Sequence, residues 1–180
     1  MESAGGQSRA LTDGLFSSTA PSWSRDGTGI YFGSDRTGRF EIWRVPLEGG
    51  AAAQVTRDGG YISAESMDAR KLYYTKTGTT GPLFELPLAG GKESQVLERV
   101  AVRGLSVFDD GIYYLDFAAP GWRKAEIRFH DFATDRSRVI NPIDGQLGLG
   151  GLTVSQDRKT FLFTLQSVSG SDLMMIENFR

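Results

Sequence analysis

The sequence contains no cysteine and one histidine, His130. Without cysteine there is no disulfide framework, no thiolate metal site and no cysteine nucleophile. A single imidazole is too few for most zinc sites, and any Ser-His-Asp triad would depend on His130 alone. The glycine-rich stretch 148–151 lacks the preceding strand and following helix of a nucleotide-binding loop. We therefore expect neither a metal nor a cofactor.

Long apolar runs and an excess of positive charge are also missing. No segment approaches the roughly 18 to 20 apolar residues of a membrane span, and Met1 is followed by Glu and small polar residues. We therefore expect no membrane segment and no signal peptide. The chain carries 20 Lys and Arg against 22 Asp and Glu. This balance argues against direct nucleic-acid binding, because phosphate contacts require a basic face.

Glycine and aromatic residues are abundant instead. The 180 residues include 23 Gly, 11 Phe, 6 Tyr and 3 Trp. Frequent turns together with many aromatic and β-branched residues are typical of short strands. No stretch holds helical apolar spacing over three turns. The composition therefore predicts an all-β protein.

A unit of about 40 to 50 residues recurs four times, which is the period of a β-propeller blade. Each copy has a serine that is followed eight residues later by an aromatic residue closing an apolar trio. These serines are Ser24, Ser66, Ser106 and Ser155. Each blade contains four antiparallel strands. We therefore expect four blades in units of about 20–56, 62–97, 101–140 and 150–180.

The two ends of the sequence complement each other. The Gly-Gly turns of the first two units, Gly49-Gly50 and Gly90-Gly91, are each followed five residues on by the centre of a short strand, at Val55 and Val96. The fourth unit ends before such a turn. Gly5-Gly6 and Leu11 have the missing spacing. We predict that residues 5–12 form the outermost strand of the last blade, which leaves no open sheet edge. Closure within one chain gives a complete propeller over residues 1–180. Exchange of these terminal strands between two half-propeller chains gives a homodimer. In the remaining alternative, the N-terminal strand belongs to a preceding blade of a longer protein.

The apolar residues of each unit predict which positions are buried. Alternate residues of the second strand in each blade must face a neighbouring blade. The positions expected to be buried are Trp23, Ile30, Phe32, Ile42, Leu72, Tyr74, Ile112, Tyr114, Leu162 and Leu173.

The first unit resembles a known repeat. Its segments Pro21-Ser22-Trp23-Ser24-Arg25-Asp26-Gly27, Ser34-Asp35-Arg36 and Gln54-Val55-Thr56 are similar to the WD-like repeat of TolB-type bacterial propellers. Arg25 stands where that family usually has proline, and units two to four lose the tryptophan and the Ser-Asp-Arg. The resemblance implies a propeller that binds a protein or peptide, usually outside the cytoplasm, for example in the periplasm. The motif is specific for fold and poor for function.

The tail carries a narrower resemblance. Residues 170–180 look like the C-terminal end of large bacterial regulators, which join a winged-helix DNA-binding domain or a serine/threonine kinase to such a propeller. The resemblance implies that this chain is the sensory or scaffolding part of a larger bacterial regulatory protein.

Blade geometry predicts where a site would lie. Loops between second and third strands, and loops between blades, emerge on one face, which we call the loop face. Trp and Arg dominate interface energetics, so the loop at 115–124 is the best candidate. The expected contact residues are Asp35, Arg36, Arg57, Tyr61, Arg103, Trp122 and Arg123.

Three functions fit these features. The first is a non-catalytic module that recognises a protein or peptide through the loop face. The second is an accessory propeller of a prolyl-oligopeptidase-like peptidase, and the third is a propeller sugar lyase or hydrolase. The sequence has no Gly-x-Ser-x-Gly nucleophile motif, and its inward positions show no cluster of His, Glu or Asp. We therefore expect a binding protein rather than an enzyme.

Overall fold

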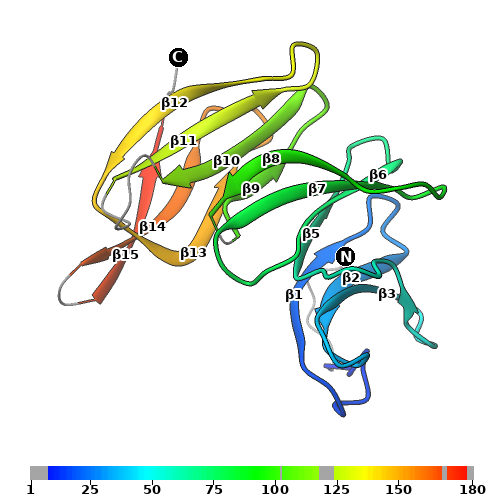
Figure 1. Ribbon diagram of the computed structural model, residues 1–180. Coiled ribbons are helices and arrows are strands. Elements are labelled where there is room, and N and C mark those ends of the chain that lie inside the picture. The colour runs from blue at the N-terminus through cyan, green and yellow to red at the C-terminus, as the bar shows by residue number, and fades with distance from the viewer. Residues whose placement is uncertain (1–7, 102, 118–123, 168–169, 178–180) are drawn as a thin grey trace.

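The computed structural model describes residues 8–101, 103–117, 124–167 and 170–177, and these residues contain strands and turns but no helix. The strands form four antiparallel sheets, which are the four blades of a β-propeller (Figure 1). The all-β propeller expected from the repeat is confirmed.

Consecutive strands of the chain are neighbours within each sheet. The first blade consists of β1 (Ser18–Trp23), β2 (Gly29–Ser34), β3 (Glu41–Pro46) and β4 (Ala53–Gln54). The second consists of β5 (Ile62–Glu65), β6 (Lys71–Thr75), β7 (Gly81–Pro87) and β8 (Ser94–Val100). The third consists of β9 (Leu105–Val107), β10 (Gly111–Phe117), β11 (Lys124–Asp131) and β12 (Arg136–Asp144). The fourth consists of β13 (Gln146–Val154), β14 (Phe161–Ser167) and β15 (Gly170–Ile176).

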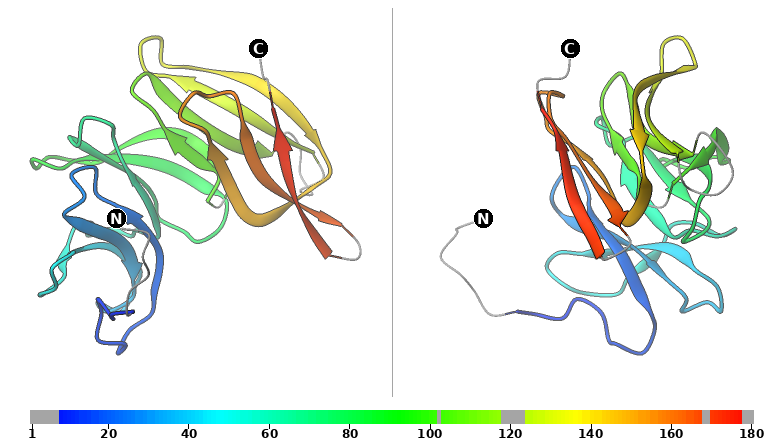
Figure 2. Two further views of the ribbon diagram at one scale, coloured as in Figure 1. Left: turned by 180° about the vertical axis from the view of Figure 1, so that it is seen from behind. Right: turned by 90° about the vertical axis from the view of Figure 1, so that its left-hand side faces the viewer.

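The blades follow one another around an arc. The first strand of each blade contacts the first strand of the next, from β1 to β5, then β9, then β13. The first and fourth blades therefore lie at opposite ends of the arc, with the other two between them (Figures 1 and 2).

The repeated serine caps the turn between the first two strands of a blade. The Ser24 hydroxyl donates to Asp26 (2.6 Å) and accepts from the Gly29 amide (2.9 Å). Ser66 and Ser155 bind Asp68 and Asp157 in the same way, at 2.7 and 2.6 Å. The third blade differs: Ser106 lies within β9 and its hydroxyl donates to the Leu152 carbonyl at 3.4 Å, while Phe108 takes the turn position of Ser24. The serine–aspartate bonds hold the turn between the first two strands in the first, second and fourth blades.

The same hydrogen bond controls an acid pKa. The Ser24 hydroxyl, followed by Thr28, lowers the pKa of Asp26 from 3.8 to about 2. Because the folded-state pKa lies below the unfolded value, the charged form stabilises the fold above about pH 4, and this contribution is lost as the pH falls toward 2. We expect Ser24→Ala to raise the pKa of Asp26 toward 3.8, measured by an NMR titration of the carboxyl carbon. An unchanged pKa would show that Ser24 is not its main partner.

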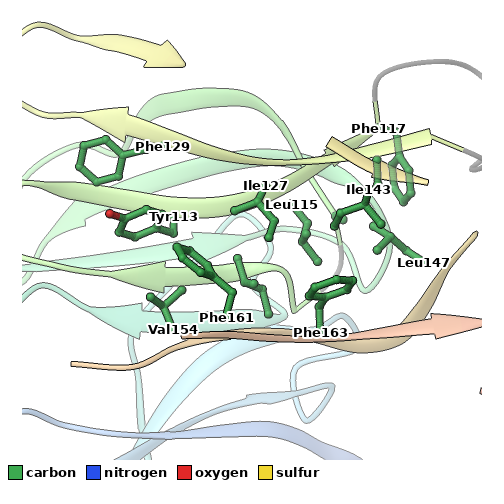
Figure 3. Close-up of a cluster of buried hydrophobic side chains, with 13 residues drawn as sticks. Tyr113, Leu115, Phe117, Ile127, Phe129, Ile143, Leu147, Val154, Phe161 and Phe163 are labelled. Carbon is green, nitrogen blue, oxygen red and sulfur yellow. The ribbon is translucent and has the colours of Figure 1, made fainter. Parts of the chain in front are cut away.

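The core lies between the blades. Its largest cluster joins Tyr113 and Ile127 of the third blade to Phe161 and Phe163 of the fourth. Figure 3 shows these side chains pointing toward one another across the interface. The Tyr113 and Phe161 rings meet edge to face at 5.3 Å. Aromatic pairs of this geometry contribute beyond the area they bury, so each blade depends on its neighbour.

Most of the predicted core positions are confirmed. Phe32, Ile42, Leu72, Tyr74, Ile112 and Tyr114 are buried, and Ile30 and Leu162 are half-buried. The prediction is wrong for Trp23 and Leu173, which are 54% and 72% exposed. Both lie on the outward faces of the first and fourth blades, which no other blade of the described residues covers.

The described part of the predicted closing strand, residues 8–12, does not pair with the last blade, and residues 5–7 of that prediction lie outside the described residues. Among the described residues the fourth sheet has three strands, and residues 8–12 contain none. Arg9 instead donates to the carbonyls of Leu47 and Glu48 in the first blade. The reason is distance, because the fourth blade lies at the other end of the arc (Figure 1).

Candidate functional site

Two of the predicted contact residues hold the first blade together. The Asp35 carboxylate accepts a hydrogen bond from the Ser17 amide at 2.9 Å. The Arg36 guanidinium lies 4.7 Å from the Trp43 ring and 5.3 Å from the Phe32 ring. Both side chains are half-buried, and their contacts give them a structural role.

Tyr61 lies where the first two blades meet. Its ring packs against Phe40 with centroids 4.8 Å apart, and its amide donates to the Thr75 carbonyl at 2.8 Å. Gly78 lies against the same ring, since a Cβ there would approach Tyr61 Cζ to 2.6 Å. One face of Tyr61 is therefore committed to packing.

The remaining predicted residues are dispersed. Arg57 is exposed beside the first two blades. Arg103 is exposed near the fourth blade, has a φ of +55°, and its carbonyl accepts from the Leu152 amide at 3.0 Å. Trp122 and Arg123 lie outside the described residues. The structure thus brings Arg57 and Tyr61 to one region and places Arg103 in another.

A groove of about 580 Å³ runs between the first two blades. Arg57 and Asp58 line it near the loop face, and the Gly90-Gly91 turn lines it at the opposite side. Leu86, Pro87 and Leu88 form an apolar wall. β4, whose two residues line the groove, is much shorter than its counterpart β8, which has seven residues.

A buried carboxylate, Glu41, stabilises the loops above the groove. Its side chain is 1% exposed and pairs with Arg39 Nε at 2.6 Å. It also accepts from the Thr56 hydroxyl (2.7 Å) and from the Gly59 amide (3.1 Å). Glu41 therefore connects β3 to the segment that leads into the second blade. A buried charge is tolerated only when it is paired and hydrogen-bonded in this way.

Ion pairs continue from Arg39 into the groove. Arg39 reaches Asp58 at 3.5 Å, and Asp58 pairs with Lys76 at 2.9 Å. Lys76 also pairs with Glu93, which accepts from the Tyr74 hydroxyl. The hydrogen bond from Lys76 lowers the pKa of Asp58, and burial raises the pKa of Tyr74. Of these side chains, Asp58, Tyr74 and Glu93 line the groove, and Lys76 links the two carboxylates.

A second groove, of about 450 Å³, lies between the second and third blades. Buried His130 lines it, with Nδ1 at 3.3 Å from the Ser137 hydroxyl and Nε2 at 3.5 Å from Asp135. Phe132 stacks on Tyr73 at 5.7 Å. Within the described ranges, no group of three or more His, Cys, Asp or Glu is arranged to hold a metal ion. In the same residues no helix is long and apolar enough to cross a membrane.

Sequence reasoning missed the ion-pair network. Glu41 occupies a strand position that alternation assigns to an apolar side chain, and this is the signal that could have revealed it. Asp58, Lys76 and Glu93 come from three separate segments, so only the fold brings them together.

These sheets define a TolB-like β-propeller fold. TolB from Acinetobacter baumannii superposes with a TM-score of 0.68 at 18% identity, over 88% of this chain and 40% of TolB. Oligogalacturonate lyase from Vibrio parahaemolyticus superposes with a TM-score of 0.59 at 17% identity, over 91% of this chain and 54% of the lyase. Puromycin hydrolase gives a TM-score of 0.56 at 17% identity, over 89% of this chain and 28% of the hydrolase. At these identities the likeness shows the fold alone.

At the sequence level, no family model matches. An uncharacterized protein of Agrobacterium fabrum is 43% identical over 51 residues, which are 28% of this chain and 17% of that protein. The chain spans less than two thirds of each of these relatives. The resemblance to TolB-type propellers is thus confirmed for the fold.

Proposed function

We propose that this chain is a non-catalytic binding module that recognises a protein or peptide through its loop face. The groove between the first two blades is the part of that face best suited to an extended segment. The observation that carries the proposal is Arg57, which is exposed beside the groove. Its guanidinium makes no hydrogen bond or ion pair with another described residue. Arginine presents a planar fork that suits carboxylates and peptide carbonyls.

The rest of the groove supports a peptide ligand. The wall of Leu86, Pro87 and Leu88 offers apolar surface for one side chain, and the carboxylates of Asp58 and Glu93, each paired with Lys76, offer hydrogen-bond acceptors. Recognition sites combine an apolar surface with a few positioned polar groups in this way. Because ion pairs hold the polar side chains in place, little side-chain entropy is lost on binding.

The test uses peptides selected for binding from a random library. We expect Arg57→Ala to weaken a selected peptide about tenfold, as removal of a contact worth about 1.4 kcal/mol does. The matched control is Arg136→Ala, which removes another exposed arginine from β12 in the third blade. Isothermal titration measures both. Equal affinity of Arg57→Ala and the parent would contradict the proposed site.

A catalytic role is the second candidate, because the structural neighbours include a lyase and a hydrolase. A propeller sugar lyase or hydrolase would cleave oligogalacturonides, and an accessory propeller of a peptidase would act only beside a hydrolase domain. Incubating the chain with oligogalacturonides and with peptides, followed by product analysis, separates these from a binding module. Turnover by the chain would overturn the non-catalytic proposal.

The setting of the module is part of the proposal. From the TolB-like fold we infer a place outside the cytoplasm, such as the periplasm, within a larger bacterial regulatory protein. Fractionation of the source cells, followed by detection of the intact gene product, tests both statements at once.

A further inference from the structure

Exposed apolar side chains concentrate at the two ends of the arc. Eight large apolar side chains are exposed among the described residues, and six of them lie in or beside the first blade or on β15. These six are Leu15, Phe16, Trp23, Leu173, Met174 and Met175. Monomeric proteins rarely expose apolar patches that are not used for binding.

The first blade presents the surface that other blades bury. In the second blade, Leu72 and Tyr74 of β6 pack against the preceding blade, and Ile112 and Tyr114 of β10 do so in the third. Phe161 and Phe163 of β14 do the same in the fourth. The equivalent residues of β2 are Ile30, which is half-buried, and Phe32, which is buried beside the Arg36 guanidinium. Trp23 stands opposite Ile30 in the register, so it belongs to the same surface.

The fourth blade presents the complementary surface. The residues that face a following blade in the first three units are Tyr31, Tyr73 and Tyr113, and Leu162 holds their place in β14. Met175 stands opposite Leu162, and Leu173 stands opposite Thr164. Leu173 and Met175 are 72% and 54% exposed.

Leu11 packs on the first blade as a residue in the outer strand of a preceding blade would. Together with Ile30, Phe32 and Val45 it lines a small apolar cavity of about 150 Å³. Between the first two blades, Val55 packs beside the equivalent residues Leu72, Tyr74 and Leu86. Val45 of the first blade is equivalent to Leu86 of the second, because Val45 pairs with Ile30 in the same register as Leu86 pairs with Leu72. Leu11 therefore corresponds to Val55.

Residues 8–12 and the fourth blade therefore have the arrangement of two complementary parts of one blade. Residues 8–12 lie where the outermost strand of a preceding blade would lie, held by the bonds of Arg9 to Leu47 and Glu48. At the other end, β15 is the edge of a sheet that has three strands among the described residues. An open edge strand is a template for pairing with another chain.

We propose that a second copy of this chain docks its fourth blade on the first blade. In this contact, β15 of one copy pairs with residues 8–12 of the other, and Leu173 and Met175 cover Trp23 and Ile30. The fourth blade fits this surface because, among the described residues, its sheet has three strands and exposes Leu173 and Met175 on the face toward a following blade. Two such contacts close a ring of eight blades, because a head-to-tail contact that closes gives a finite assembly.

The test measures the mass of the 180-residue chain by light scattering over a range of concentrations. We expect twice the 19.7 kDa of one chain. Leu173→Glu and Trp23→Glu should each reduce the mass to that of one chain, and circular dichroism should show that both variants stay folded. Val139→Glu is the matched control, because Val139 is 44% exposed on β12, away from both ends.

Mixing the two variants tests the head-to-tail geometry. Each variant keeps one intact end, so an equimolar mixture should recover the mass of two chains through a single contact. A contact between two first blades could not be recovered in this way. A wild-type chain with the mass of one copy at every concentration would overturn the proposal, as would a dimer unaffected by Leu173→Glu, a mixture that fails to recover, or a series of masses above two copies.

Discussion

Phe161→Ala should lower the free energy of unfolding by about 3 to 5 kcal/mol, the usual cost of removing a buried phenylalanine. Phe161 is 1% exposed and belongs to the cluster that joins the third and fourth blades. Its ring contacts Tyr113, so truncation removes an aromatic pair and leaves a cavity between two sheets. Denaturant titration monitored by fluorescence measures the change.

Val139→Ala is the control for this substitution. Val139 is a 44% exposed residue on β12, and surface substitutions of this kind usually change stability by less than about 0.5 kcal/mol. A loss below about 1 kcal/mol for Phe161→Ala would contradict the packing of the fourth blade on the third.

Glu41→Ala should lower the free energy of unfolding by about 2 to 4 kcal/mol. The substitution leaves the Thr56 hydroxyl and the Gly59 amide without their buried acceptor, and each unsatisfied buried group costs about 1 to 3 kcal/mol. Arg39 contributes less to the loss, because its side chain is 55% exposed and can be solvated by water. Thermal unfolding and denaturant titration both measure the effect.

Glu48→Ala is the matched control, since Glu48 is exposed in the turn that follows β3. A change within about 0.5 kcal/mol is expected there. If Glu41→Ala were as mild as Glu48→Ala, the carboxylate would not be the anchor of the loops above the groove.

The blade pattern could be predicted because it is local. Alternation along the second strand of each unit assigns Leu72, Tyr74, Ile112 and Tyr114 to a blade interface, where the structure places them. The same alternation predicts that residues of the first and fourth blades are buried. Their burial, however, requires a blade on the outward face, and alternation within one repeat does not show whether that blade is present. Leu173 is exposed for this reason.

The candidate site was only partly predictable. Arg57 and Tyr61 could be assigned to the loop face, because the loop between two blades emerges there. The ion-pair network from Glu41 through Asp58 to Lys76 and Glu93 could not be predicted from the sequence, because it joins residues of two blades. The ligand contact expected of Arg36 stays a prediction, and its stacking on Phe32 and Trp43 could not be predicted because the sequence does not show these residues to be neighbours.

Ligand binding in the groove between the first two blades is tested most directly by amide hydrogen exchange, with and without a selected peptide. Bound peptide should slow exchange in residues 53–58 and 86–93, which line the groove from both blades. It should leave β12 of the third blade unchanged, because that strand lies outside the groove. Protection that is confined to the third or fourth blade, with none in residues 53–58 and 86–93, would contradict the proposed binding site.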